Sequence, residues 1–221
     1  MTNSEEDEIL SALPLLSGLL EEKSIKHYTQ VIPVTIHHFY LTGEISDEVD
    51  RYVDMLNIIK TSEPHDKIFI YLNTPGGDLN TTIQIISAIS KSPAEITTVI
   101  EGEVCSAGTF IFLSGDYYIV NDNCSFMIHN YSHGAIGKGG EVAKRVKFSE
   151  KYFKDLAHSF YKDFLTEEEI QAVCEDKDFW FGSVELIERL KQRGDDKIVE
   201  FNYDIDEEEV IEKNSKPKPK T

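Results

Sequence analysis

Apolar strand-like runs alternate with helical patterns through the middle of the chain, and this alternation limits the folds open to it. Residues 67–72 form a continuous run, Lys-Ile-Phe-Ile-Tyr-Leu, of the kind found in strands that are buried on both faces. A helical pattern over 79–90 and a second strand-like run over 95–101 follow within a few residues. Parallel strands need such crossover helices, so the sequence predicts βαβ units and an α/β fold.

The flanking segments extend the same pattern. The further elements that we expect are a strand over 31–41, a helix from Ser46 to before Pro64, a helix opening at Ser106, strands over 117–121 and 125–129, a long helix over 141–165, a helix N-cap at Thr166 and a last helix over 183–192. The strand over 125–129 ends on a histidine, and a glycine-rich loop over 134–140 separates it from the long helix.

The two ends of the chain differ in composition from its middle. Residues 1–29 combine an acidic start with a short apolar stretch that Pro14 interrupts. Residues 195–221 are acidic and then rich in lysine and proline, a composition typical of disorder. We therefore expect one domain over 30–194, flanked by an N-terminal arm and a disordered tail.

Charge and cysteine usage exclude several classes of function. The formal net charge of −18 argues against nucleic acid or an anionic membrane as the main partner. Three widely spaced cysteines, without Cys-x-x-Cys or His-Glu-x-x-His, indicate neither a disulfide framework nor a zinc site, and we expect no cofactor. No basic-then-apolar leader begins the sequence, and the stretch over 10–20 is too short to span a bilayer. A cytoplasmic protein is expected.

Ser106 lies between small residues where a predicted strand meets a predicted helix, in the stretch Gly-Glu-Val-Cys-Ser-Ala-Gly-Thr-Phe over 102–110. A hydroxyl there can project into a cleft beside the unpaired N–H groups of the helix's first turn, which suits a nucleophile. Serine in such a position is more often only a helix N-cap. Taken alone, the stretch favours the cap.

Two other stretches could complete an active site around Ser106. His129 ends a predicted strand, where open α/β sheets place catalytic groups, although a core histidine fits the pattern too. The pair Gly76-Gly77 follows the strand over 67–72 and can leave backbone N–H groups uncovered, although a plain tight turn is the alternative.

Two familiar motifs are absent. The loop over 134–140 lacks the spacing of a phosphate-binding loop, so no nucleotide site is predicted. Val104 stands where the Gly-x-Ser-x-Gly elbow requires glycine, and an acid beyond His129 would give the order Ser, His, Asp. Both observations disfavour the α/β-hydrolase fold.

Five stretches, in order between about residues 38 and 190, resemble motifs of the proteolytic subunit of the Clp protease, the ClpP family. They are Leu-Thr-Gly-Glu-Ile over 41–45, Ile-Phe-Ile-Tyr-Leu-Asn-Thr-Pro-Gly-Gly over 68–77, Gly-Glu-Val-Cys-Ser-Ala-Gly over 102–108, Asn-Cys-Ser-Phe-Met-Ile-His over 123–129 and Asp-Lys-Asp-Phe-Trp-Phe over 176–181. The resemblance implies a ClpP/crotonase-type α/β fold of repeated βαβ units, with the helix over 141–165 as a protruding handle.

The resemblance also implies the roles of individual residues. Ser106 would be the nucleophile, His129 the general base and Asp178 the orienting acid of a serine endopeptidase. Gly77 and Ala107 would offer backbone N–H groups to the oxyanion. Asp176 is a rival for the acid, but it stands where the family has no catalytic residue.

The family assembles as a homo-oligomer of two stacked heptameric rings, and an AAA+ unfoldase feeds it polypeptide substrates. This chain departs from the family pattern at Asn130-Tyr131, where Gln-Pro is usual, and at Leu190, where glycine is usual. Two alternatives of the same family are a non-catalytic or regulatory subunit and a virus-type maturation protease. A crotonase-type acyl-CoA enzyme would share the fold, but the Ser-His-Asp set argues against it.

Overall fold

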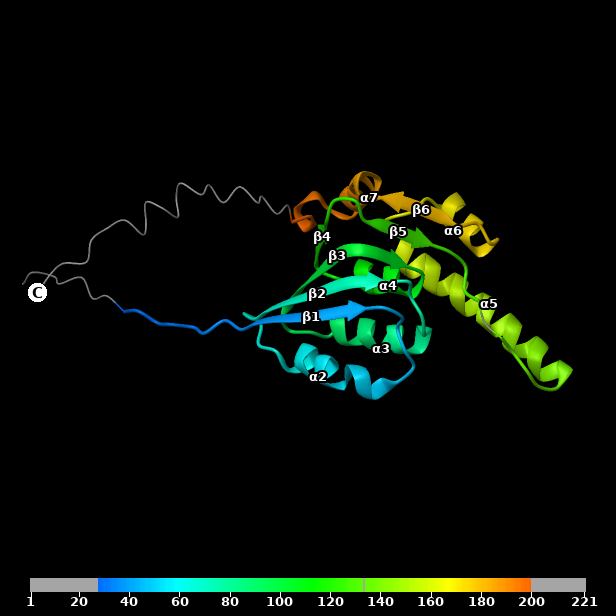
Figure 1. Cartoon of the computed structure of the whole chain (residues 1–221), viewed down its shortest axis with the longest axis horizontal. Helices are drawn as coiled ribbons and strands as arrows, with labels where there is room; N and C mark the ends of the chain where they lie inside the picture. The colour runs from blue at the N-terminus through cyan, green and yellow to red at the C-terminus, as the bar shows by residue number, and fades with distance from the viewer. Residues whose placement is uncertain (1–27, 133, 200–221) are drawn as a thin grey trace, which may run out of the picture. The chain divides into compact units, whose positions relative to one another are not determined.

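A computed structural model of the chain describes residues 28–132 and 134–199 (Figure 1). The chain divides into two units, residues 1–33 and 34–221, and the fold lies in the second. Its strands are β1 (Ile36–Thr42), β2 (Lys67–Thr74), β3 (Glu95–Cys105), β4 (Tyr117–Val120), β5 (Ser125–Ile128) and β6 (Phe179–Gly182). Its helices are α2 (Val53–Thr61), α3 (Leu79–Ile89), α4 (Ala107–Leu113), α5 (Gly139–Tyr161), α6 (Glu167–Cys174) and α7 (Ser183–Leu190), with short 3₁₀ helices η1 (Val49–Tyr52), η2 (Lys191–Arg193) and η3 (Asp195–Lys197).

One mixed sheet organises the described residues. Its strand order is β1-β2-β3-β5-β6, and β4 pairs with the first half of β3 while β5 pairs with its end. The strands from β1 to β5 are parallel, so the predicted α/β fold of repeated βαβ units is confirmed. Strand β6 pairs antiparallel with β5, and no sequence pattern had indicated that strand.

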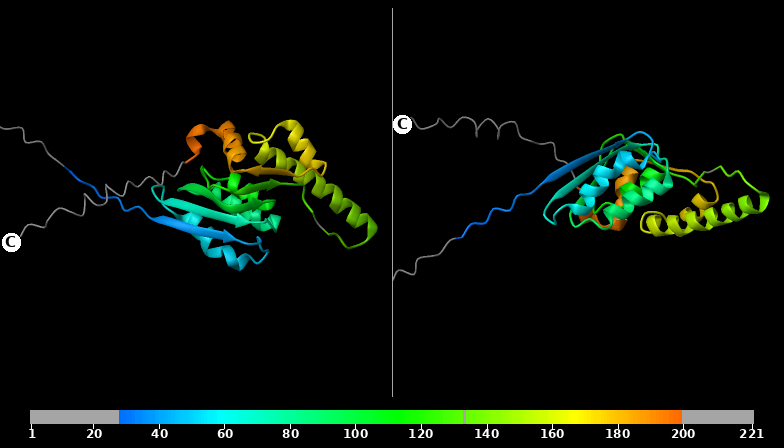
Figure 2. Two further views of the ribbon diagram at one scale, coloured as in Figure 1. Left: turned by 45° about the horizontal axis from the view of Figure 1, so that its top comes forward. Right: turned by 90° about the horizontal axis from the view of Figure 1, so that it is seen from below.

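The core lies between the sheet and the helices along one of its faces. Figure 1 and Figure 2 show α2, α3 and α4 running beneath the strands. On one face of β2, the side chains of Ile68, Ile70 and Leu72 are fully buried. Phe69 and Tyr71 on the other face are only half-buried, so the strand is less enclosed than the continuous apolar run predicted. Asp78 caps α3 by accepting a hydrogen bond from the Thr81 N–H at 2.7 Å.

The long helix α5 is the predicted handle. Its buried side chains, Phe153, Leu156, Ala157 and Tyr161, all belong to its C-terminal half. The N-terminal half extends beyond the sheet, as Figure 1 shows. Thr166 then caps α6 in a reciprocal capping box with Glu169, as the sequence indicated.

Several predicted boundaries were wrong. The first strand begins at Ile36, five residues later than expected. The hydroxyl of Ser46 accepts a hydrogen bond from the Glu48 N–H in a turn, and helical structure begins only at Val49. Most of the N-terminal arm (1–29) and of the C-terminal tail (195–221) lies outside the described residues. Among the residues that are described, no helix is long and apolar enough to cross a membrane.

Candidate active site

The predicted site residues follow the carboxyl ends of three neighbouring parallel strands. Gly77 follows β2, Ser106 follows β3 and His129 follows β5. Because the carboxyl ends of parallel strands meet at one edge of a sheet, the fold brings these residues together. This edge is the place where open α/β sheets bind ligands.

Ser106 has a strained backbone at the junction between β3 and α4. Its φ of 53° and ψ of −125° lie outside the regions that L-residues favour. Such a conformation costs about 1–3 kcal/mol and persists only where surrounding contacts enforce it. The side chain makes no capping hydrogen bond, although Ser106 occupies the N-cap position of α4. The interpretation of Ser106 as only a cap is therefore wrong.

Hydrogen bonds on both sides hold the Ser106 backbone. Its N–H donates to the Met127 carbonyl on β5 at 2.9 Å. Its carbonyl accepts from the Thr109 hydroxyl at 2.6 Å, and that hydroxyl lies 2.7 Å from the Tyr161 hydroxyl on α5. Since Thr109 has one hydroxyl proton, Tyr161 must donate to it. A buried chain of hydrogen bonds thus links α5 to Ser106.

The glycine pair after β2 permits two close backbone approaches. Gly76 has a φ of 97°, and a Cβ on it would lie 2.7 Å from the Ser106 Cβ and 2.8 Å from the Cys105 carbonyl. Gly77 has a φ of 146°, and a Cβ there would overlap the backbone of Ile45. The family resemblance assigned a role to Gly77 alone, but Gly76 is the residue that packs against Ser106. The Gly-Gly pair was the available signal.

Ser106, His129, Gly77 and Ala107 line one cleft with a volume of about 750 Å³. His129 is half-buried rather than a core residue. Among the described residues, the Gly77 and Ala107 N–H groups donate no backbone hydrogen bond. Two unpaired donors therefore lie in the same cleft as a serine and a histidine.

Helix α5 forms the facing wall of this cleft with Arg145, Phe148 and Tyr152 among its lining residues. The rings of Phe148 and Tyr152 stack with centroids 5.9 Å apart. They remain 68% and 40% exposed, which leaves apolar surface available beside Ser106.

Asp178 lies outside the cleft lining and is exposed, in the segment just before β6. The last pair of the β5–β6 ladder joins Ile128 to Phe179. Continuing this antiparallel register by one residue places Asp178 directly opposite His129, where Cβ atoms are typically about 5 Å apart. In residues 28–132 and 134–199, no hydrogen bond or ion pair links Ser106, His129 and Asp178.

The rival acid, Asp176, has a different partner. Its carboxylate accepts a hydrogen bond at 2.8 Å from the side-chain amide of Asn130, the residue after His129.

The thiol of Cys105, the residue before Ser106, is unsuited to nucleophilic chemistry, because burial raises its pKa to about 11. No group of three His, Cys, Asp or Glu residues within the described ranges could hold a metal ion.

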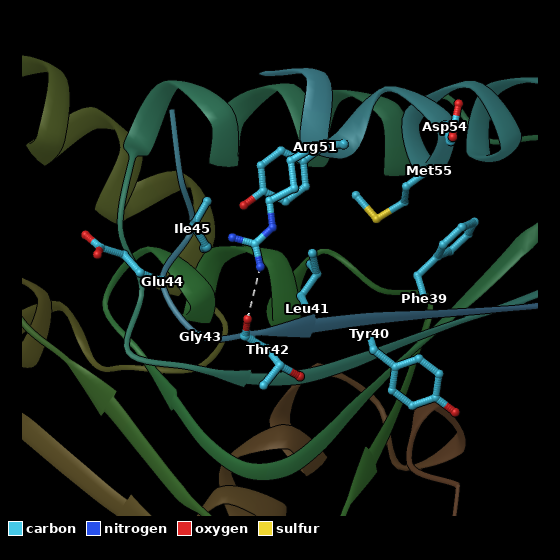
Figure 3. A pocket seen from close by; sticks show the side chains of 11 residues that line it. Phe39, Tyr40, Leu41, Thr42, Gly43, Glu44, Ile45, Arg51, Asp54 and Met55 are labelled. Atoms are coloured by element: carbon cyan, nitrogen blue, oxygen red, sulfur yellow. Dashed lines mark hydrogen bonds between the residues drawn. The ribbon is translucent and has the colours of Figure 1, made fainter. Parts of the chain in front are cut away.

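A second cavity, of about 230 Å³, lies between β1 and the region of η1 and α2 (Figure 3). Figure 3 shows the Arg51 guanidinium directed at the Thr42 carbonyl, to which it donates at 3.4 Å. None of Ser106, His129 and Asp178 lines this cavity, and Glu44 is the one lining residue that it shares with the cleft.

A model of the Clp protease family matches residues 21–189 of the chain. The matched segment includes the whole sheet, the cleft and every predicted site residue.

Proposed function

The chain belongs to the Clp protease family, and from this premise we propose that it is a serine endopeptidase with Ser106, His129 and Asp178 as its catalytic triad. One observation carries the proposal. Ser106 is held in a strained strand-to-helix turn, and its side chain, free of any capping bond, shares a cleft with His129. Strained backbone conformations occur mainly at functional sites, because they cost free energy and persist only where the surrounding structure enforces them.

The proposed chemistry assigns one task to each group. His129 takes the proton of the Ser106 hydroxyl as that oxygen attacks the substrate carbonyl, and later returns it to the leaving amine. Asp178 orients the imidazole and stabilises its protonated form. The unpaired N–H groups of Gly77 and Ala107 stabilise the tetrahedral oxyanion, a contribution of about 3 kcal/mol for one donor.

We also propose that the substrates are polypeptides and that the chain works in a ring-shaped homo-oligomer fed by an AAA+ unfoldase. Family membership supports this assembly. The projecting half of α5, with its exposed Phe148 and Tyr152, offers apolar surface for contacts between copies. Particle mass and hydrolysis of a short peptide, measured on one sample, would test the assembly.

The test of the triad is labelling with a fluorophosphonate probe, which reacts with activated serines. The wild-type protein should be labelled and Ser106→Ala should not. Ser132→Ala is a matched control, because Ser132 lines the same cleft and should not affect labelling. Absence of labelling in the wild type, or equal labelling of Ser106→Ala, would refute the assignment.

A non-catalytic or regulatory subunit is the second candidate. The observation in its favour is that no hydrogen bond joins the three triad side chains in the part of the chain that the structure describes. Catalytic hydrogen bonds are often long in proteins without substrate, which is why we rank this candidate second. Co-assembly with a related chain, without probe labelling of this one, would favour it.

A further inference from the structure

Asp176 has a backbone conformation that favours glycine. It follows the C-terminus of α6 with a φ of 68°. Its N–H donates to the Val173 carbonyl at 3.2 Å, and the Lys177 N–H donates to the Ala172 carbonyl at 3.0 Å. These two bonds form a Schellman motif, in which the residue at the position of Asp176 is usually glycine. An aspartate at this position has a less favourable backbone conformation than glycine would have, which indicates that its side chain has a function.

The side chain of Asp176 is hydrogen-bonded to the side-chain amide of Asn130, which makes three hydrogen bonds in all. Asn130 Nδ2 donates to Asp176 Oδ1 at 2.8 Å and to the Cys174 carbonyl at 3.2 Å. Asn130 Oδ1 accepts from the Tyr131 N–H at 2.9 Å. The two chain segments that carry His129 and Asp178 are thus joined by a side-chain hydrogen bond, one residue after His129 and two residues before Asp178.

The position of this bond relative to the sheet gives it a role. The β5–β6 ladder ends at the pair Ile128 and Phe179, and no backbone hydrogen bond among the described residues joins the segments after it. His129 and Asp178 therefore lie between the last ladder pair on one side and the Asn130–Asp176 bond on the other. Without that bond, only the longer hydrogen bond from Asn130 to the Cys174 carbonyl, at 3.2 Å, would join the two segments beyond the ladder.

We propose that Asn130 and Asp176 are positioning residues that hold His129 opposite Asp178. The inference rests on the proposed triad. It gives a role to Asp176, the rival acid, and to Asn130, which departs from the family pattern. It does not make Asp176 a catalytic residue, because its carboxylate is bound to Asn130 rather than to His129. A displacement of about 1 Å in a catalytic group can lower turnover about 100-fold.

Two substitutions at position 176 separate positioning from folding. Asp176→Gly removes the acceptor while relieving the backbone, so it should unfold at no lower urea concentration than the wild type. Its kcat on a short peptide should fall at least tenfold with little change in KM. Asp176→Asn keeps an oxygen acceptor and tolerates positive φ, so it should retain a kcat within about twofold of the wild type.

Asn130→Ala provides an independent measurement of the same bond. It also removes the hydrogen bond to the Cys174 carbonyl, so it should lose at least as much kcat as Asp176→Gly. The double variant should lose little more than Asn130→Ala, because the bond between Asn130 and Asp176 is already absent from that variant. Unchanged particle mass in all variants excludes an effect through assembly. Wild-type kcat in Asp176→Gly, or equal losses in Asp176→Gly and Asp176→Asn, would overturn the proposal.

The fluorophosphonate probe distinguishes a failure of the proposed triad from a failure of the positioning role. If the wild type is not labelled at Ser106, the triad fails and the positioning role fails with it. If the wild type is labelled and Asp176→Gly is labelled at the same rate, only the positioning role is wrong.

Discussion

Replacing Gly76 by alanine would add a methyl group where the turn after β2 meets Ser106. The new Cβ would lie 2.7 Å from the Ser106 Cβ, 2.8 Å from the Cys105 carbonyl oxygen and 3.0 Å from the Ala107 nitrogen. Two of these contacts are to backbone atoms, which cannot turn aside as a flexible side chain would. The substitution therefore pushes directly on the proposed nucleophile and on one proposed oxyanion donor.

A matched control separates this contact from the cost of positive φ. Gly43 has a φ of 81°, close to the 97° of Gly76, but a Cβ on it would have no neighbour within 4 Å. Gly43→Ala should thus show the conformational cost alone, about 1 kcal/mol. Gly76→Ala adds an overpacking cost of about 1–3 kcal/mol. The free energy of unfolding should fall by about 3 kcal/mol in Gly76→Ala.

Urea unfolding and the rate of fluorophosphonate labelling measure the two consequences. Gly76→Ala should be labelled about 10–100-fold more slowly than the wild type, since the Ser106 backbone must shift to admit the methyl group. Gly43→Ala should be labelled at the wild-type rate. Equal stability of the two variants, together with wild-type labelling of Gly76→Ala, would refute the argument from contact.

Three further predictions concern buried polar groups. Tyr161→Phe removes the hydroxyl that donates to Thr109, and it should lower the free energy of unfolding by about 1 kcal/mol and slow labelling of the neighbouring serine; unchanged values for both would contradict the proposed link. Hydrogen bonds from Arg189 hold the pKa of Glu169 in the folded protein below its ordinary value of 4.5. The ionised carboxylate therefore stabilises the fold above pH 4.5, and this stabilisation is lost as the pH falls below 4.5 and through the lowered pKa. Urea unfolding at pH 3.5–6 should therefore show a weaker pH dependence in Glu169→Gln, and an identical slope would count against it. Burial raises the pKa of Cys105 to about 11, so a maleimide should modify it slowly at pH 7.5. Mass spectrometry of proteolytic peptides would separate Cys105 from Cys124 and Cys174, and rapid modification of Cys105 would contradict its burial.

The sequence predicted most of the parallel elements, because each is encoded by its own residues. The runs over 67–72 and 79–90 have the periodicities of a buried strand and an amphipathic helix, and the structure has β2 and α3 there. Strand β6 was missed because its pairing with β5 joins segments about fifty residues apart. Local patterns contain no information about such a partner.

The candidate site was predicted in its residues but not in its geometry. The positive φ of Ser106 could not be inferred, because it depends on Gly76 and Met127, which come from other parts of the fold. The nearby Thr109 also contributes, and its hydroxyl is bound to the distant Tyr161. The contacts of Asp176 could not be inferred either, and from the sequence this residue was considered only as a rival to Asp178 for the role of the acid. Its contact with Asn130, forty-six positions away, becomes visible only in the structure.

The strained turn at Ser106 has a consequence for the time at which the chain becomes reactive. The contacts that impose it include Met127 and, through Thr109, Tyr161, both of which leave the ribosome after the serine. A chain that is still being made, or one in which α5 has not yet docked, lacks these contacts and has no reason to keep the unfavourable conformation. Its Ser106 is then an ordinary, unreactive hydroxyl. On the proposed mechanism, the peptidase is therefore latent during its own synthesis.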